Sequence, residues 1–171
     1  MKSIHFLTGG SRSGKSTKAL ELTHGFKTKA FIATAQAFDD EMRERIKKHQ
    51  EERGNEFINF EAHLNLAQAI QEASLVAEVI VIDCLTVWLG NLMYYNEKSY
   101  PHYLEIETFY QALENCSKPL IIVSNELGMG LIPETSLGLK FRDLAGRINQ
   151  ETAKRATEVT FVVSGLPIKL K

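Results

Sequence analysis

Eight consecutive residues near the N-terminus combine glycines, a lysine and hydroxyl side chains in a spacing suited to binding phosphate. They are Gly9-Gly10-Ser11-Arg12-Ser13-Gly14-Lys15-Ser16, which fit the pattern G-x-x-x-x-G-K-[ST]. Glycines let the backbone approach phosphate oxygens closely, and backbone N–H groups at a helix N-terminus attract anions. Lys15 would contact the β- and γ-phosphates of a nucleoside triphosphate, and the Ser16 hydroxyl would bind Mg²⁺. A nucleotide-binding loop is therefore favoured over a glycine-rich turn without a ligand.

An acidic residue later in the chain is the partner that such a loop needs. Four apolar residues, 79–82, are followed by Asp83. Many strands end in Asp simply because it caps the next helix. Together with the glycine loop, however, the pattern indicates a carboxylate that holds Mg²⁺ directly or through water. The predicted metal ligands are Ser16 and Asp83.

The role of one histidine has two interpretations. Asp39 and Asp40 resemble a helix N-cap, and the following segment extends to Arg53, with Gly54 as its stop. His49 lies in this segment among charged residues, which favours an ordinary surface histidine. The alternative is a nucleophile, since a neutral imidazole can attack a phosphate and carry the group covalently.

Five short apolar runs alternate with helical stretches, and these elements must position the loop and Asp83. The runs cover residues 4–7, 30–34, 79–83, 120–124 and 160–164. Continuous apolar, β-branched runs are typical of strands buried on both faces. Strands that alternate with helices predict a single α/β domain over residues 1–171, a RecA-like, three-layer fold of the P-loop NTPase type with a mainly parallel sheet. Ligands should bind at the carboxyl ends of its strands.

The composition excludes several classes of protein. A formal net charge of −1 gives no general attraction to nucleic acid or anionic membranes. The cysteines, Cys84 and Cys116, show no metal-binding or redox spacing, which favours a reduced, cytoplasmic setting. The N-terminal apolar run is too short for a signal peptide, and no stretch is long enough to cross a bilayer.

The region after the fourth run carries further candidates. Residues 125–133 contain two glycines and a proline, as expected for a shaped loop on the ligand side, and Glu126 within it could act as a base or simply be exposed. Arg142 and Arg147 lie on the predicted helix that follows. They could hold a substrate phosphate, or be solvated or paired with Asp143. Gly146 within that helix suggests close packing, because glycine costs about 1 kcal/mol there relative to alanine.

The ordered motifs resemble those of one family. Residues 8–16 are similar to its opening T-G-G-x-R-S-G-K-S, residues 39–49 resemble its block D-D-E-M-x-x-R-I-x-x-H, and residues 125–130 match N-E-x-G-x-G. Further matches are Ala33-Thr34-Ala35, Arg142-Asp143, Gly146-Arg147, Asn149-Gln150 and residues 163–169. On these motifs, the sequence is identified as a member of the bifunctional adenosylcobinamide kinase and adenosylcobinamide-phosphate guanylyltransferase family of cobalamin biosynthesis.

That resemblance implies two reactions. ATP or GTP phosphorylates the hydroxyl of the corrinoid's aminopropanol arm, and GTP then transfers GMP to that phosphate through a guanylylated histidine, which falls on His49. The resemblance also implies a homotrimer with sites at subunit contacts. The implied nucleotide contacts are the glycine loop, Ala33, Thr34, Ala35, Gln50, Glu51, Glu52, Arg53, Glu61 and Asp83.

Two rival functions remain open from the sequence. One is a P-loop small-molecule kinase in which His49 is inert. The other is a nucleotide-binding module of the recombinase type, which should carry a basic and aromatic surface for single-stranded nucleic acid. The near-zero net charge speaks against the second.

Overall fold

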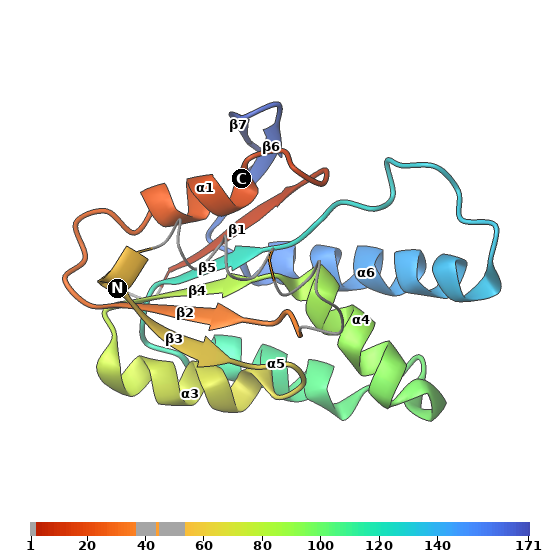
Figure 1. Cartoon of the computed structure of the whole chain (residues 1–171), viewed down its shortest axis with the longest axis horizontal. Coiled ribbons are helices and arrows are strands. Elements are labelled where there is room, and N and C mark those ends of the chain that lie inside the picture. Colours follow the sequence, from red (N-terminus) through yellow and green to blue (C-terminus); the bar gives the residue numbers. More distant parts are fainter. Residues whose placement is uncertain (1–2, 37–43, 45–53) are drawn as a thin grey trace.

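The chain folds around a seven-stranded sheet with helices on both faces (Figure 1). The computed structural model describes residues 3–36, 44 and 54–171. The strand order is β3-β2-β4-β5-β1-β6-β7, and every neighbouring pair is parallel except β6 and β7. The strands are β1 (Ile4–Gly9), β2 (Lys29–Ala33), β3 (Phe57–Glu61), β4 (Val79–Asp83), β5 (Leu120–Val123), β6 (Glu158–Val163) and β7 (Leu166–Lys169).

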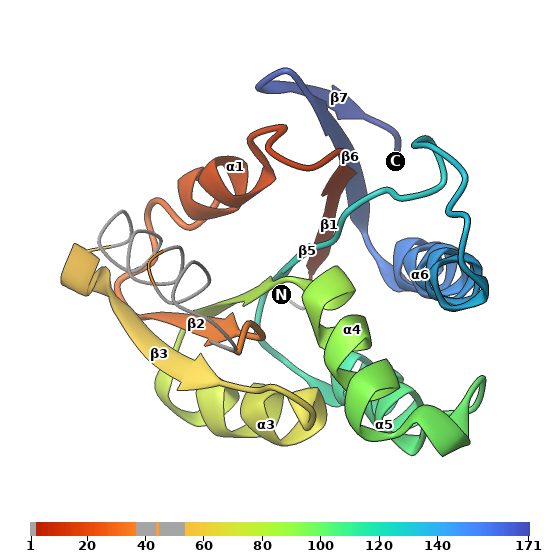
Figure 2. The same cartoon turned by 45° about the vertical axis from the view of Figure 1, so that its right-hand side comes forward.

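The helices divide unequally between the two faces (Figure 2). Among the described residues, α1 covers one face, while α3, α4, α5 and α6 cover the other. The predicted three-layer α/β architecture is thereby confirmed. The helices are α1 (Lys15–Glu21), α3 (Leu66–Val76), α4 (Leu85–Tyr95), α5 (Leu104–Asn115) and α6 (Ser136–Arg155), with short 3₁₀ helices η1 (Gly54–Glu56) and η2 (Glu97–Ser99).

The alternation of side chains along the strands divides the core into two clusters. On the α1 face, Leu7 packs with Ala19 and with the inward residues of the neighbouring strands. On the other face, Phe6 belongs to a larger cluster that includes Trp88 and Phe109. The rings of Trp88 and Phe109 lie 5.2 Å apart between centroids. Both faces of the sheet are thus buried, as continuous apolar runs predict.

The five predicted strands are all present, with ends that differ by at most a few residues. The strands β3 and β7, which the apolar runs did not predict, are both edge strands. In β3, polar residues interrupt the apolar ones and most side chains stay partly or fully exposed. In β7, Pro167 breaks the pattern, which an edge strand tolerates because proline lacks an N–H to donate. Half-exposed edges leave a weaker signal in sequence than buried strands do.

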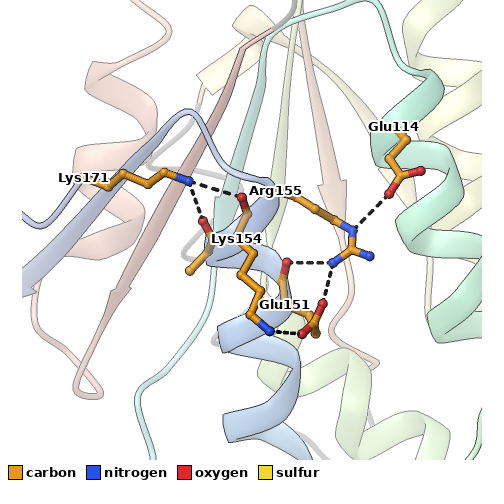
Figure 3. A network of polar contacts seen from close by, with 6 residues as sticks. Glu114, Glu151, Lys154, Arg155 and Lys171 are labelled. Carbon is orange, nitrogen blue, oxygen red and sulfur yellow. Dashed lines mark hydrogen bonds and ion pairs between the residues drawn. The ribbon is translucent and has the colours of Figure 1, made fainter.

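The last strand is followed by a residue that ties the C-terminal end of α6 to the sheet. The Nζ of Lys171 donates hydrogen bonds to the carbonyl oxygens of Ala153, Lys154 and Ala156. These carbonyls belong to the last turn of α6 and to its C-cap, Ala156, where backbone acceptors have no partner within the helix. A positive charge at this end also complements the helix dipole. Figure 3 shows part of this network, with Lys171 and Lys154, together with Arg155 and Glu151.

Candidate nucleotide-binding site

The glycine loop joins β1 to α1, as the motif requires. Gly14 is the N-cap of α1 with φ 99°, a left-handed conformation that favours glycine. Gly9 has φ 148°, and a Cβ at this position would stand 2.2 Å from the carbonyl oxygen of Val162. Both glycines are therefore required by the conformation and packing of the loop. The arrangement of strand, loop and helix predicted from the sequence is confirmed.

The ammonium group of Lys15 is folded back into this loop. The side chain is buried, and Nζ donates hydrogen bonds to the Gly10 carbonyl oxygen at 2.5 Å and to Ser13 Oγ at 3.4 Å. Burial lowers the pKa of Lys15, and the nearby Asp83 opposes that effect by raising it. The interaction places Lys15 and Asp83 within electrostatic range, although they are 68 residues apart in sequence. The lysine and the acid paired by the motif are thus brought near each other by the fold.

The turn between β6 and β7 supports the loop from outside. Its Gly165 N–H donates to the Ser13 carbonyl oxygen at 2.9 Å, and a Cβ at Gly14 would lie 3.3 Å from the Cα of Gly165. Ser164 and Gly165 have φ of 52° and 79°, as in tight hairpin turns of the primed type. Sequence reasoning did not predict this contact. The signal available was a Ser-Gly pair between two apolar runs.

The strand register brings three other predicted residues to one edge of the sheet. Ala33 at the end of β2 pairs with Glu61 of β3 on one side and with Asp83 of β4 on the other. Glu61 is exposed and Asp83 partly exposed, so both carboxylates are accessible from the carboxyl end of the strands. This is the edge at which open α/β sheets bind ligands.

A buried network holds the ends of β2 and β4 together. The Thr34 hydroxyl donates to the Cys84 carbonyl oxygen and accepts from the Cys84 N–H, both at 2.9 Å. Because Thr34 is fully buried, its hydroxyl acts between strands, while its neighbours Ala33 and Ala35 are partly exposed. Burial raises the pKa of Cys84 to about 12, so this thiol stays neutral at physiological pH.

Asn91 of α4 extends this network to the segment after β3. The sequence analysis did not identify this role of Asn91. Its Nδ2 donates to the carbonyl oxygens of Thr34 at 2.9 Å and His63 at 3.0 Å. One turn further along α4, the Tyr95 hydroxyl donates to Gln36 at 2.9 Å. The chain after β2 and the chain after β3 are thereby fixed to the same helix. The available signal was a single amide in the middle of an apolar helix.

The structure gives the positions of some of the remaining predicted site residues, and the others lie outside the described part of the chain. Gly10, Ser11 and Arg12 are exposed on the loop, whereas Ser13 is buried and Ser16 partly exposed. His49 and the predicted contacts Gln50, Glu51, Glu52 and Arg53 lie outside the described residues, as does the rest of the predicted helix except Glu44, which is helical.

The donor set at this site suits Mg²⁺. Ser16 opens α1 beside Lys15, and Asp83 lies within electrostatic range of the same lysine. Hydroxyl and carboxylate oxygens are the hard ligands that Mg²⁺ binds, usually while keeping several waters and bridging phosphates. Within residues 3–36, 44 and 54–171 there is no group of three or more His, Cys, Asp or Glu arranged to hold a metal by themselves. The residues fit a cation shared with nucleotide phosphates.

A cavity of about 540 Å³ lies beside the glycine loop, on the face of the sheet that carries α6. Its lining includes Glu126, Arg142, Gly146 and Arg147. The expectation of close packing at Gly146 is wrong, because a Cβ there would meet no atom within 4 Å. The glycine instead leaves the wall of the cavity open. Among the described helices, none is long and apolar enough to cross a membrane.

Solved structures resemble the fold. A KaiC-like protein from Pyrococcus horikoshii OT3 has a TM-score of 0.55 and 16% identity, with 94% of this chain and 70% of that chain covered. The RadB recombinase has a TM-score of 0.51 and 16% identity, with 94% and 74% covered. At such low identity the likeness shows the fold alone, and it confirms a P-loop NTPase architecture.

Curated relatives are much closer in sequence. The bifunctional adenosylcobalamin biosynthesis protein CobU of Escherichia coli (strain K12) is 36% identical over 177 residues, which cover 96% of this chain and 98% of the relative. The corresponding protein CobP of Pseudomonas aeruginosa is 38% identical over 168 residues, with 96% and 95% covered. The family model described as cobinamide kinase / cobinamide phosphate guanyltransferase matches residues 5–170. The match over residues 5–170 and these identities over nearly the whole chain show that the chain belongs to the cobinamide kinase / cobinamide phosphate guanyltransferase family.

Proposed function

We propose that this chain is a bifunctional enzyme of cobalamin biosynthesis. It phosphorylates adenosylcobinamide with ATP or GTP, and then transfers GMP from GTP to adenosylcobinamide phosphate, with release of pyrophosphate. The observation that carries the proposal is the family match over residues 5–170, which includes both the glycine loop and the segment around His49. Relatives that cover nearly the whole chain are named bifunctional.

In the kinase step, the protein positions the triphosphate and neutralises its charge. The backbone of the glycine loop and the N-terminus of α1 would cradle the phosphates. Lys15 would leave its internal acceptors, Gly10 and Ser13, for phosphate oxygens. Ser16 and Asp83 would hold Mg²⁺, which supplies further charge stabilisation when bound. Since phosphoryl transfer depends mainly on positioning and electrostatics, these groups account for most of what the reaction requires.

In the guanylyl transfer step, His49 is the proposed nucleophile. Its neutral imidazole attacks the α-phosphate of GTP, the bond from that phosphorus to the bridging oxygen breaks, and pyrophosphate leaves. The phosphoryl oxygen of adenosylcobinamide phosphate then attacks the same phosphorus and releases the histidine. The base and ribose of GTP are assigned to Ala33, Thr34, Ala35, Gln50, Glu51, Glu52, Arg53 and Glu61.

Assembly and location belong to the same proposal. The enzyme is expected to be a homotrimer with its sites at subunit contacts. Both cysteines, Cys84 and Cys116, are buried and free of disulfides, which is compatible with the proposed cytoplasmic location.

The covalent step is the sharpest test. The purified protein is incubated with Mg²⁺ and GTP labelled at the α-phosphate, without corrinoid, and then denatured. We expect acid-labile, alkali-stable label on the wild type and none on His49→Ala, which should keep much of the kinase activity. A folded, GTP-binding wild-type protein that takes up no label would instead support a plain kinase with an inert His49.

A further inference from the structure

The cavity beside α6 lies close to the glycine loop through two of its lining residues. Thr8, which lines it, immediately precedes Gly9, and Glu126, also in the lining, donates its N–H to the Gly9 carbonyl oxygen at 2.9 Å. Phe6 and Thr8 point to the α6 face, whereas Leu7 between them points to the α1 face. A molecule in this cavity would therefore sit next to the phosphate loop but on the opposite side of the sheet from α1.

Two buried polar atoms of the lining lack partners in the described part of the chain. They are Thr8 Oγ1 and Asn149 Oδ1, on side chains that are only 7% and 6% exposed. The other end of the Asn149 amide is fixed, because Nδ2 donates to the Asn125 carbonyl oxygen at 3.0 Å. Buried polar groups are almost always hydrogen-bonded. Asn149 Oδ1 and Thr8 Oγ1 thus lack a protein partner in the wall of the cavity, and because each exposes less than 1 Å² to solvent, a ligand that bonds to them must displace part of that wall.

The charges around the cavity balance. The lining contains two basic residues, Arg142 and Arg147, and two acidic ones, Glu126 and Asp143. Arg142 Nε lies 3.8 Å from Asp143 Oδ1, and Glu126 Oε1 accepts the Gly128 N–H at 2.8 Å. The acidic groups offset the arginines, so the cavity is a poorer site for a bare phosphate than two arginines alone would make. Apolar walls such as Phe6 and mixed hydrogen-bonding groups suit a neutral ligand with amides.

We propose that this cavity binds an amide-bearing arm of the acceptor, the corrinoid substrate, and so holds it beside the phosphate loop. The inference rests on the proposed function, because it names the place of that function's second substrate. Corrinoid side chains end in primary amides, whose N–H groups match Asn149 Oδ1 and whose carbonyl oxygens match Thr8 and Arg147. A volume of about 540 Å³ is within the usual range of small-molecule sites, about 300–1,000 Å³.

Gly146 provides a way to fill the cavity without disturbing α6. A Cβ at this position meets nothing within 4 Å, so Gly146→Phe projects a ring into the open space. Gly90 of α4 is a matched control, since it is also a helical glycine whose Cβ would meet nothing within 4 Å, and it does not line the cavity. Both substitutions raise helix propensity, and only one of them narrows the proposed site.

The experiment measures cobinamide binding by equilibrium dialysis, detected by the visible absorbance of the corrin ring. GTP binding and thermal unfolding report the fold of each variant. We expect Gly146→Phe to weaken cobinamide binding at least about tenfold, as overfilling of a packed site costs, while Gly90→Phe matches the wild type. Equal affinity of wild type and a folded Gly146→Phe would overturn the inference.

A second variant keeps the test decisive if Gly146→Phe does not fold. Arg147 is exposed and makes no ion pair within the described residues, so Arg147→Ala should leave stability unchanged and weaken cobinamide binding about fivefold by losing one hydrogen bond. Unchanged affinity in Arg147→Ala would count against the cavity in the same way. If the wild type itself binds GTP but no cobinamide, the proposed function fails, and the inference fails with it.

Discussion

Two polar networks of similar size lie in very different surroundings. At the carboxyl end of the sheet, Thr34, Cys84 and Asn91 are buried and satisfy one another through short hydrogen bonds. At the C-terminal end of α6, Arg155 bonds to Glu151 and Glu114 at the surface (Figure 3). The first network lies at the candidate nucleotide site, and the second joins α6 to α5 and to the end of the chain.

The difference shows that a hydrogen bond's contribution depends on what replaces it when it is broken. Water takes over the partners of Arg155 or Glu151, so exposed ion pairs contribute about 0–1 kcal/mol. When Asn91 is removed, the Thr34 carbonyl oxygen keeps, within the described residues, only the long contact to His63 Nδ1 at 3.5 Å, and an unsatisfied buried group costs about 1–3 kcal/mol. Arg155 also packs over the Tyr110 ring at 4.3 Å from its centroid, a contribution that does not depend on the ion pairs.

The largest effect is expected at the start of the glycine loop. In Gly9→Ala the new Cβ would stand 2.2 Å from the Val162 carbonyl oxygen, with φ of 148°, so β6 or the loop must move. We expect a loss of at least about 3 kcal/mol in the free energy of unfolding, measured by urea denaturation, together with loss of GTP binding. Gly10→Ala is the control, because a Cβ there meets nothing within 4 Å. A Gly9→Ala protein as stable as that control would show that the loop and β6 adjust freely.

A smaller loss is expected from the buried network. Asn91→Leu keeps a similar shape but removes both donors, leaving the carbonyl oxygens of Thr34 and His63 without that amide. We expect a loss of about 2–4 kcal/mol in the free energy of unfolding, and weaker GTP binding because the ends of β2 and β3 are no longer held to α4. Asn59 is the matched control, since its amide donates to the Phe57 carbonyl oxygen at the surface, and Asn59→Leu should change stability by less than about 0.5 kcal/mol. Equal losses in the two variants would remove the distinction between buried and exposed networks.

The smallest effect is expected in the surface network, and it depends on pH. Hydrogen bonds from Lys154 and then Arg155 lower the pKa of the partly exposed Glu151 below its ordinary value of 4.5. A carboxylate whose pKa is lower in the folded state stabilises the fold above its unfolded pKa, and this contribution is lost as the pH falls through the lowered value. We expect Glu151→Gln to unfold at a slightly lower temperature than wild type at pH 7, and the gap to close as the pH falls below about 4.5.

The control for this pH dependence is Glu107 of α5, which is exposed and makes no ion pair in the described part of the chain. Glu107→Gln should differ little from wild type across the same range. If the difference between Glu151→Gln and wild type stayed constant with pH, the ionic character of the network would be refuted.

Local patterns in the sequence were sufficient to predict the central part of the candidate site. The glycine loop and the five buried strands are continuous in sequence, so their spacing and apolar character predict them directly, and the structure confirms them. Lys15 and Asp83 were paired through a known motif, and the fold places them within electrostatic range. The roles of His49 and of residues 50–53 came from resemblance to a family, and they stay predictions because they lie outside the described residues.

Other features arose only when distant segments packed together. Three features join residues more than 15 positions apart in the chain. They are the contact of Gly165 with the glycine loop, the hydrogen bonds from Asn91 to the segments after β2 and β3, and the cavity beside Gly146. The low helix propensity of glycine led to the prediction of close packing at Gly146, whereas the space around this residue is open. Sequence periodicity reports which face of an element is apolar, and motifs report which groups can bind phosphate. Whether a buried amide finds a carbonyl, or a glycine faces a wall or a void, depends on the neighbours that folding supplies.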